Sequence, residues 1–231
     1  MFNSSVTRRT LMASSAARVP AILEAWYPGT SGGAAIANLL SGRVNPSGRL
    51  PVTFPLSVAQ LPRPVRPGTG LKDKEMFSVA YNEGASVGYK WFDAKLLKPL
   101  FPFGQGLSYS NFSYSGLRAS ARPGALTVSF TVQNSGSRRA MDVPQVYVAP
   151  VDGGWEAPKR LGGFTKIDLA PSEARTVSVS VDPRLLAMYC DNSWRIAAGE
   201  YHVLLGASSA DIRQTVRVKI AARTLPGDWR P

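Results

Sequence analysis

LTVSFTVQN, residues 126–134, is the stretch of this sequence that decides the fold. Apolar residues occupy every second position and polar residues stand between them, which is the period of a β-strand with one buried face. Asn-Ser-Gly at 134–136 supplies turn residues where the alternation stops. The stretch therefore predicts a strand of an antiparallel sheet.

The same alternation recurs along the chain after this strand. Gly, Pro and Asp separate the runs, and a helical period is indicated only at 183–188. Short strands at this density are typical of an antiparallel β-sandwich of the immunoglobulin-like class. We expect residues 111–225 to form a complete sandwich, with 226–231 as a tail. The further runs are 146–148, 177–181, 201–205 and 216–220.

The chain upstream of the sandwich has a different pattern. Residues 19–27 are mostly apolar and end at Pro28-Gly29, which predicts a strand buried on both faces. Apolar residues at helical spacing follow from 34 to 40, and Gly42 stops them. Strand, turn and helix make half of a βαβ unit, which needs further layers to bury it. We expect an incomplete α/β sandwich, with self-association through its exposed apolar remnant.

Residues 45–80 predict turns and loops. Asn-Pro-Ser-Gly at 45–48 has turn chemistry, and residues 50–54 suit an edge strand or an extended segment. Pro and Arg crowd the stretch from 61 to 70, which favours a surface loop. We expect protease to cut first between Leu56 and Ala80 and to leave a resistant piece that begins near Phe101.

Composition limits the choice of partners and chemistry. The chain of 231 residues carries a formal net charge of +12, but its basic residues are spread out and occur at most in pairs. A solvated basic surface is therefore favoured over a nucleic-acid site. Cys190 and His202 are the single residues of their types, which argues against a disulfide, a metal site, a bound cofactor and a Ser-His-Asp triad.

Residues 1–18 resemble an export signal or form a disordered N-terminus. Paired arginines at 8–9 precede an apolar region, as in a twin-arginine signal, but Arg18 ends that region after residues 11–17. A working signal would make the protein periplasmic or secreted, and otherwise it would be cytoplasmic. No segment has the roughly 20 apolar residues that a membrane-spanning helix needs.

An ordered series of motifs resembles glycoside hydrolase family 3, the β-glucosidase type. The resemblance implies that residues 19–110 are the C-terminal part of an α/β-sandwich domain. It also implies that residues 111–225 are a fibronectin type III-like domain, with LGGF at 161–164 among its motifs. The motifs of the first part are AWYPG at 25–29, NPSGRLPVTFP at 45–55, YNEG at 81–84, VGYKWFD at 87–93 and FPFGQGLSY at 101–109.

The resemblance assigns no catalytic residue to this chain. In the family, the nucleophilic Asp lies in an N-terminal barrel and the acid/base Glu lies upstream of the position that matches Val19. Glycoside hydrolysis needs both carboxyl groups, so we expect no hydrolysis by this chain alone. Glu83 and Trp155 are the two candidates for sugar contact; a loop hydrogen bond and interdomain packing are their alternative roles.

Three functions remain open on the sequence. The chain is a family 3 piece that is not catalytic alone, a secreted β-sandwich module that binds carbohydrate or a partner, or one subunit of a split β-glucosidase whose barrel is encoded separately.

Overall fold

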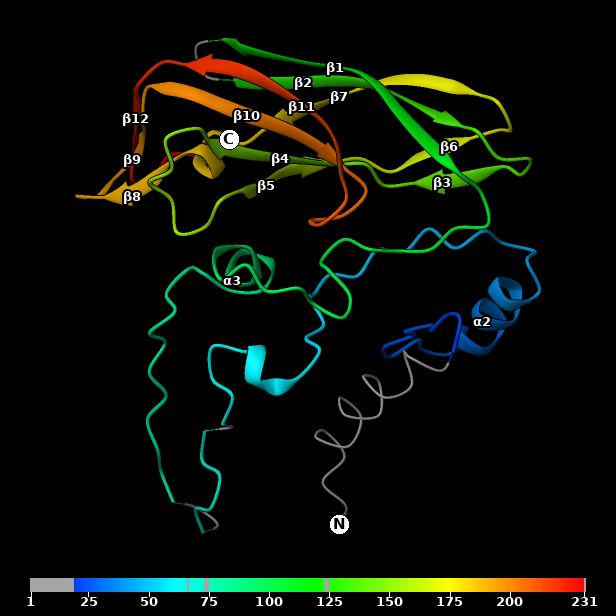
Figure 1. The fold of residues 1–231 in the computed structure, drawn as a ribbon, viewed down its shortest axis with the longest axis horizontal. Helices are drawn as coiled ribbons and strands as arrows, with labels where there is room; N and C mark the ends of the chain where they lie inside the picture. Colours follow the sequence, from blue (N-terminus) through cyan, green and yellow to red (C-terminus); the bar gives the residue numbers. More distant parts are fainter. Residues whose placement is uncertain (1–18, 66, 73–74, 123–124, 231) are drawn as a thin grey trace.

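The computed structural model describes residues 19–65, 67–72, 75–122 and 125–230. A β-sandwich occupies one half of the molecule, and the chain before β1 forms a looser second half (Figure 1). None of the helices in the described ranges has the length and apolar character of a membrane-spanning segment. The helices are α2 (Gly32–Leu40) and α3 (Tyr89–Ala94), with the 3₁₀ turns η1 (Val58–Gln60) and η2 (Pro183–Leu186).

The strands of the described chain all lie after residue 111 and pair antiparallel. The alternation at 126–134 is confirmed as a strand, since it lies within β2. The strands are β1 (Phe112–Arg122), β2 (Ala125–Asn134), β3 (Ala140–Asp142), β4 (Gln145–Pro150), β5 (Arg160–Phe164), β6 (Ile167–Leu169), β7 (Ala174–Val181), β8 (Met188–Cys190), β9 (Ser193–Ile196), β10 (Gly199–Gly206), β11 (Ile212–Ile220) and β12 (Arg223–Pro226).

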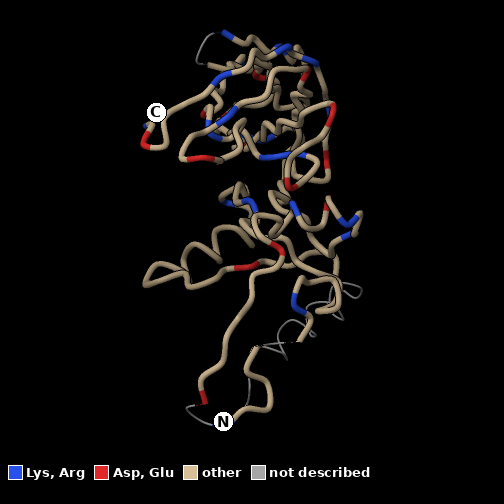
Figure 2. Tube along the Cα trace, turned by 90° about the vertical axis from the view of Figure 1, so that its left-hand side faces the viewer, with Lys and Arg blue, Asp and Glu red and all other residues tan. Residues whose placement is uncertain are grey.

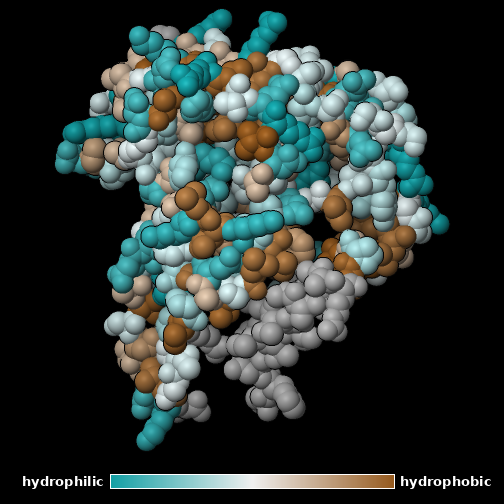
Figure 3. Space-filling view, viewed as in Figure 1, coloured by the Kyte–Doolittle hydropathy of each residue, from teal (hydrophilic) through white to brown (hydrophobic). Residues whose placement is uncertain are grey.

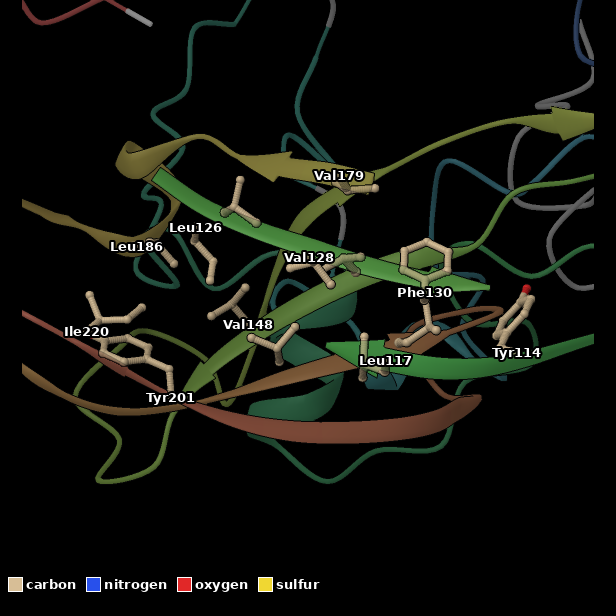
Figure 4. Packing of buried hydrophobic residues seen from close by; sticks show 14 of the residues in the cluster. Tyr114, Leu117, Leu126, Val128, Phe130, Val148, Val179, Leu186, Tyr201 and Ile220 are labelled. Atoms are coloured by element: carbon tan, nitrogen blue, oxygen red, sulfur yellow. The ribbon is translucent and has the colours of Figure 1, made fainter. Parts of the chain in front are cut away.

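Two sheets enclose the hydrophobic core. One has the strand order β1-β2-β7 and the other β11-β10-β4-β5, while β12-β9-β8 and β3-β6 form small sheets beside them. Val128 and Phe130 of β2, like Val148 and Tyr201 of the opposite sheet, belong to the core between the two sheets (Figure 4). All four side chains are almost fully buried. The sandwich therefore closes its own core, as the alternation predicted.

β4 is buried on both faces, whereas the sequence pattern at 146–148 predicted one. Val146 and Val148 face the core, and Tyr147 points the other way and is still inaccessible to solvent. α3 and the segment around Phe103 cover this outer face, since Tyr89 and Phe103 pack on one another and Tyr89 packs on Tyr147. The last part of the α/β segment is thus packed as an outer layer of the sandwich.

The predicted strand at 19–27 is wrong. These residues pair with no strand in the described chain, and most of them are exposed or half-buried. A strand of a parallel sheet forms only where neighbouring strands accept its hydrogen bonds, and these ranges supply no such neighbour. The helix predicted at 34–40 is confirmed as α2, and the extended segment at 50–54 makes one bridge, between Phe54 and Phe101.

This packing changes where we expect protease to stop. Cleavage should still begin between residues 56 and 80, but the resistant piece should begin near Gly88, not near Phe101. α3 buries Phe92 and covers β4, so its removal would expose the outer face of the sheet. Limited proteolysis followed by intact-mass measurement gives the new N-terminus. A stable piece beginning at Phe101 would show that α3 is not part of the folding unit, which we propose to be residues 88–230.

Candidate functional site

Glu83 is held by an ion pair inside a loop. Its side chain is only 4% exposed, and the carboxylate accepts a hydrogen bond from Nη1 of Arg63. The guanidinium of Arg63 also lies 4.6 Å from the ring centre of Tyr81 and donates to the carbonyl of Ala80 at 3.5 Å. These contacts close the base of the loop between residues 63 and 83, and they match the loop hydrogen bond considered from the sequence.

Trp155 packs against the sandwich. The indole is half-buried, with its ring centre 5.9 Å from that of Tyr201, a core residue of β10. The guanidinium of Arg160 lies 4.2 Å from the centre of the same indole. Neighbours on the sandwich itself therefore cover part of the indole of Trp155.

Tyr89 is the central contact between α3 and the sandwich. Its ring lies 5.8 Å from that of Tyr147, edge to face, and 5.1 Å from that of Phe103. Its hydroxyl oxygen accepts a hydrogen bond from the backbone N–H of Leu161 at 2.7 Å. Burial raises the pKa of the Tyr89 hydroxyl, so it remains protonated at physiological pH.

An ionic cluster extends this contact. Glu156 accepts hydrogen bonds from Nζ of Lys90 at 2.6 Å and from Nη2 of Arg160 at 2.5 Å, which joins α3 to β5. Burial acts to raise the pKa of Glu156, but the bonds from Arg160 and Lys90 together lower it to about 2. The carboxylate is therefore ionised throughout the physiological range. Arg160 also donates from Nη1 to the carbonyl of Ala187 at 2.7 Å, which adds the end of η2 to the cluster.

A second set of buried polar contacts joins the α/β segment to the sandwich. Nη2 of Arg49 donates to Oδ1 of Asp142 at 2.5 Å. Nε2 of Gln145 donates to the carbonyls of Gly104 and Ala207, both at 3.0 Å. Gly104 has φ +81, and a Cβ there would lie 2.0 Å from Oε1 of Gln145. Only glycine fits this position, so the 101–109 motif serves close docking.

An open groove lies beside the ionic cluster. Its volume is about 560 Å³, and α3, η2 and the β8–β9 hairpin line it. Tyr189 and Trp194 are opposite one another on that hairpin, with ring centres 4.9 Å apart and planes at 62°. The alternation in the sequence did not predict this hairpin. Its signal was Asp191-Asn192, a two-residue turn in which both residues have positive φ.

The fold and these contacts define a class of protein in which the end of an α/β domain is docked on a fibronectin type III-like sandwich. Residues 4–109 match the family "Glycosyl hydrolase family 3 C-terminal domain". Residues 142–209 match the family "Fibronectin type III-like domain". The chain belongs to glycoside hydrolase family 3 and corresponds to the C-terminal part of its members. The first match begins inside the segment 1–18, which lies outside the described residues.

Relatives of known activity support the same assignment. Beta-glucosidase B of Emericella nidulans is 38% identical over 217 residues, which are 89% of this chain and 26% of that protein. An exo-alpha-(1->6)-L-arabinopyranosidase of Bifidobacterium breve is 40% identical over 205 residues, 86% of this chain and 26% of that protein. The structure of beta-glucosidase 3B of Thermotoga neapolitana in complex with glucose matches this chain with a TM-score of 0.78 at 35% identity. The match covers 85% of this chain and 28% of that protein's chain. The chain spans about a quarter of the length of these relatives.

Proposed function

We propose that this chain supplies the C-terminal part of a family 3 glycoside hydrolase and contributes to hydrolysis only together with the rest of that fold. In this role the sandwich and α3 form a base that holds residues 19–61 in place. The observation that carries the proposal is the unequal burial of the two halves. The sandwich buries its core on both sides of β4, whereas the segment before η1 leaves large apolar side chains exposed.

The exposed apolar side chains lie on consecutive pieces of the α/β segment. Apolar surface recurs over the lower half of the molecule and around α2 (Figure 3). Leu40, at the end of α2, is 71% exposed. Soluble proteins bury such clusters against a further layer of the same domain or against a partner. The exposed side chains of this segment include Val19, Leu23, Trp26, Leu40, Val44 and Val52.

A small apolar hollow in the same segment also indicates a missing neighbour. Its volume is about 300 Å³, and Trp26, Phe54 and Leu100 are among the residues that line it. Oγ1 of Thr53 is buried at this hollow and has no hydrogen-bond partner among the described residues. An unpaired buried hydroxyl costs free energy, which a polar group from an added layer would recover.

The proposal includes the split enzyme that the sequence left open, in which a separately encoded barrel subunit supplies the remaining part of the fold. By analogy with the relatives, the substrates would be glycosides such as β-glucosides. Export by the paired arginines at 8–9 stays a prediction, as does self-association when no partner covers the segment.

The test is complementation. This chain should be combined with a Thermotoga neapolitana beta-glucosidase 3B that lacks its matching part, and aryl β-glucoside hydrolysis should be measured. We expect no turnover by either part alone and activity from the mixture. Leu40→Lys should abolish association by placing a charge on the exposed segment, while Val151→Lys on the sandwich should not. Glu83→Gln should leave activity of the mixture within about threefold of the unsubstituted chain, since its contacts are structural.

Two results would contradict the proposal. One is turnover by the purified chain alone that Glu83→Gln abolishes, which would make Glu83 catalytic. The other is a monomeric chain that melts in one sharp transition and neither binds the complementary part nor self-associates, because its α/β segment would then have a closed core of its own.

A further inference from the structure

The groove beside the β8–β9 hairpin has the components of a small-ligand site. It is concave, has a volume of about 560 Å³, and combines aromatic and charged side chains. Pockets that bind small molecules have volumes of roughly 300–1,000 Å³ and combine apolar walls with a few polar groups. The groove is lined by Ala85, α3 and the sandwich, and no residue of the segment 19–61, which carries the proposed association, lines it.

The wall formed by α3 and β5 is held in place by its own contacts. Arg160 directs Nε and Nη2 to Glu156, and its Nη1 to the carbonyls of Leu185 and Ala187. All three nitrogens of its guanidinium therefore donate hydrogen bonds, and it fixes η2 relative to β5. A site that is already ordered loses little conformational entropy when a ligand binds.

The aromatic wall is also oriented but remains accessible. The hydroxyl of Tyr189 donates to Oδ1 of Asn192 at 2.8 Å, and Nε1 of Trp194 donates to the carbonyl of Gly227 at 3.4 Å. Trp194 supports Tyr189 edge to face, yet Tyr189 is 54% exposed. A ring that is fixed and exposed offers a flat apolar surface at a small entropic cost.

Two cations of the groove have unused hydrogen-bond donors. Arg184 directs Nε and Nη2 to the carboxylate of Asp182, and its Nη1 has no partner among the described residues. Lys90 gives one hydrogen bond, to Glu156, from an ammonium group with three donors. The groove therefore combines an exposed aromatic ring with free N–H groups at its walls.

The charges in the groove argue against a polyanion as its ligand. Its lining includes Lys90, Arg160 and Arg184 but also Glu156 and Asp182, so charges of both signs are mixed. Basic and acidic residues are likewise interspersed over the described sandwich (Figure 2). A nucleic-acid or sulfated-polymer site needs a continuous field of one sign. The apolar surface of a single hairpin is also small compared with that of a stable protein interface.

We propose that this groove binds a pyranose unit of a neutral oligosaccharide. The apolar C–H face of the sugar would stack on Tyr189, and its hydroxyl oxygens would accept hydrogen bonds from Arg184 and Lys90. This site does not depend on the proposed complementation. It would hold a carbohydrate chain on the sandwich.

The test uses the full chain and a panel of neutral β-linked gluco-, xylo- and galacto-oligosaccharides. Binding is measured by NMR titration and by tryptophan fluorescence. We expect saturable binding of at least one sugar with a Kd on the order of 1 mM. Tyr189→Ala should weaken it at least about tenfold, because the stacking surface is lost. Tyr189→Phe should keep it, and Tyr27→Ala, at a tyrosine that is 99% exposed outside the groove, should leave it unchanged.

Three outcomes would overturn the proposal. They are no binding by any member of the panel, binding that Tyr189→Ala leaves unchanged, and loss of binding that Tyr27→Ala reproduces. Thermal melting of each variant shows whether the hairpin is still folded. If Tyr189→Ala melts early, the Arg184→Gln variant replaces it in the titration, and unchanged binding by Arg184→Gln also counts against the site.

Discussion

Asp142→Ala is expected to lower the free energy of unfolding by about 3–5 kcal/mol, because it leaves a buried charge without its partner. The side chain of Asp142 is 3% exposed and that of Arg49 is 11% exposed. Oδ1 of Asp142 lies 2.5 Å from Nη2 of Arg49. The second carboxylate oxygen accepts a hydrogen bond from the hydroxyl of Tyr114 at 2.7 Å. Burial raises the pKa of that hydroxyl, so Tyr114 remains protonated and acts as a hydrogen-bond donor. The substitution therefore also removes the acceptor of Tyr114. Urea denaturation of the two proteins measures the difference.

A matched control for this prediction lies on the neighbouring strand. Asp168 of β6 pairs with Arg139, but the Arg139 side chain is largely exposed, so Asp168→Ala should be close to the unsubstituted protein in stability. Asp142→Asn should fall between the two, since an amide can still accept the bond from Tyr114. Equally small losses of unfolding free energy for Asp142→Ala and Asp168→Ala would contradict this prediction. They would show that Arg49 becomes solvated when its partner is removed and that its bond to Asp142 does not fix the α/β segment.

The sequence predicted those parts of the fold that depend on short-range pattern. Alternation identified β2 because each of its inner side chains, such as Val128, only needs an opposite sheet. The run at 19–27 failed because a doubly buried strand depends on neighbours that the pattern does not contain. α3 was missed because its residues, 89–94, are too few to show a helical period, and its contacts with the sandwich hold it.

The candidate site shows the same division. Three of the motifs quoted for the family resemblance occur where the two halves of the molecule meet, as Arg49, Tyr89 and Gly104 illustrate, whereas Glu83 of the 81–84 motif pairs with Arg63 in its own segment. They could be read as structural from turn and glycine chemistry, but their partners on the sandwich could not. The hairpin with Tyr189 was not predicted because its strands, of three and four residues, are too short to show an alternating pattern around the Asp191-Asn192 turn. Part of what the resemblance marks in this chain is therefore the docking of one domain on the next.

Tyr147→Ala tests this docking, and we expect a loss of about 3–5 kcal/mol in unfolding free energy together with a new protease site. The ring of Tyr147 is inaccessible to solvent and contacts Tyr89 on α3. Its hydroxyl donates to Oε1 of Gln145 at 2.6 Å, and Gln145 in turn holds the carbonyl of Gly104. Removing the ring leaves a cavity between β4 and α3 and frees that amide. Cleavage should then reach the chain between α3 and Phe101, which we expect to stay uncut in the unsubstituted protein.

Two further variants separate the docking from the stability of the sandwich core. Tyr147→Phe keeps the ring and removes only the bond to Gln145, so it should lose about 1 kcal/mol and keep the resistant piece that begins near Gly88. Val128→Ala, inside the core, should lower stability without moving the protease site, because it leaves the outer face of β4 unchanged. If Tyr147→Ala loses stability but still gives a piece that begins near Gly88, the other contacts of α3, led by Lys90 with Glu156, are sufficient to hold it. The ionic contacts, and not the aromatic contact, would then be what holds α3 on the sandwich.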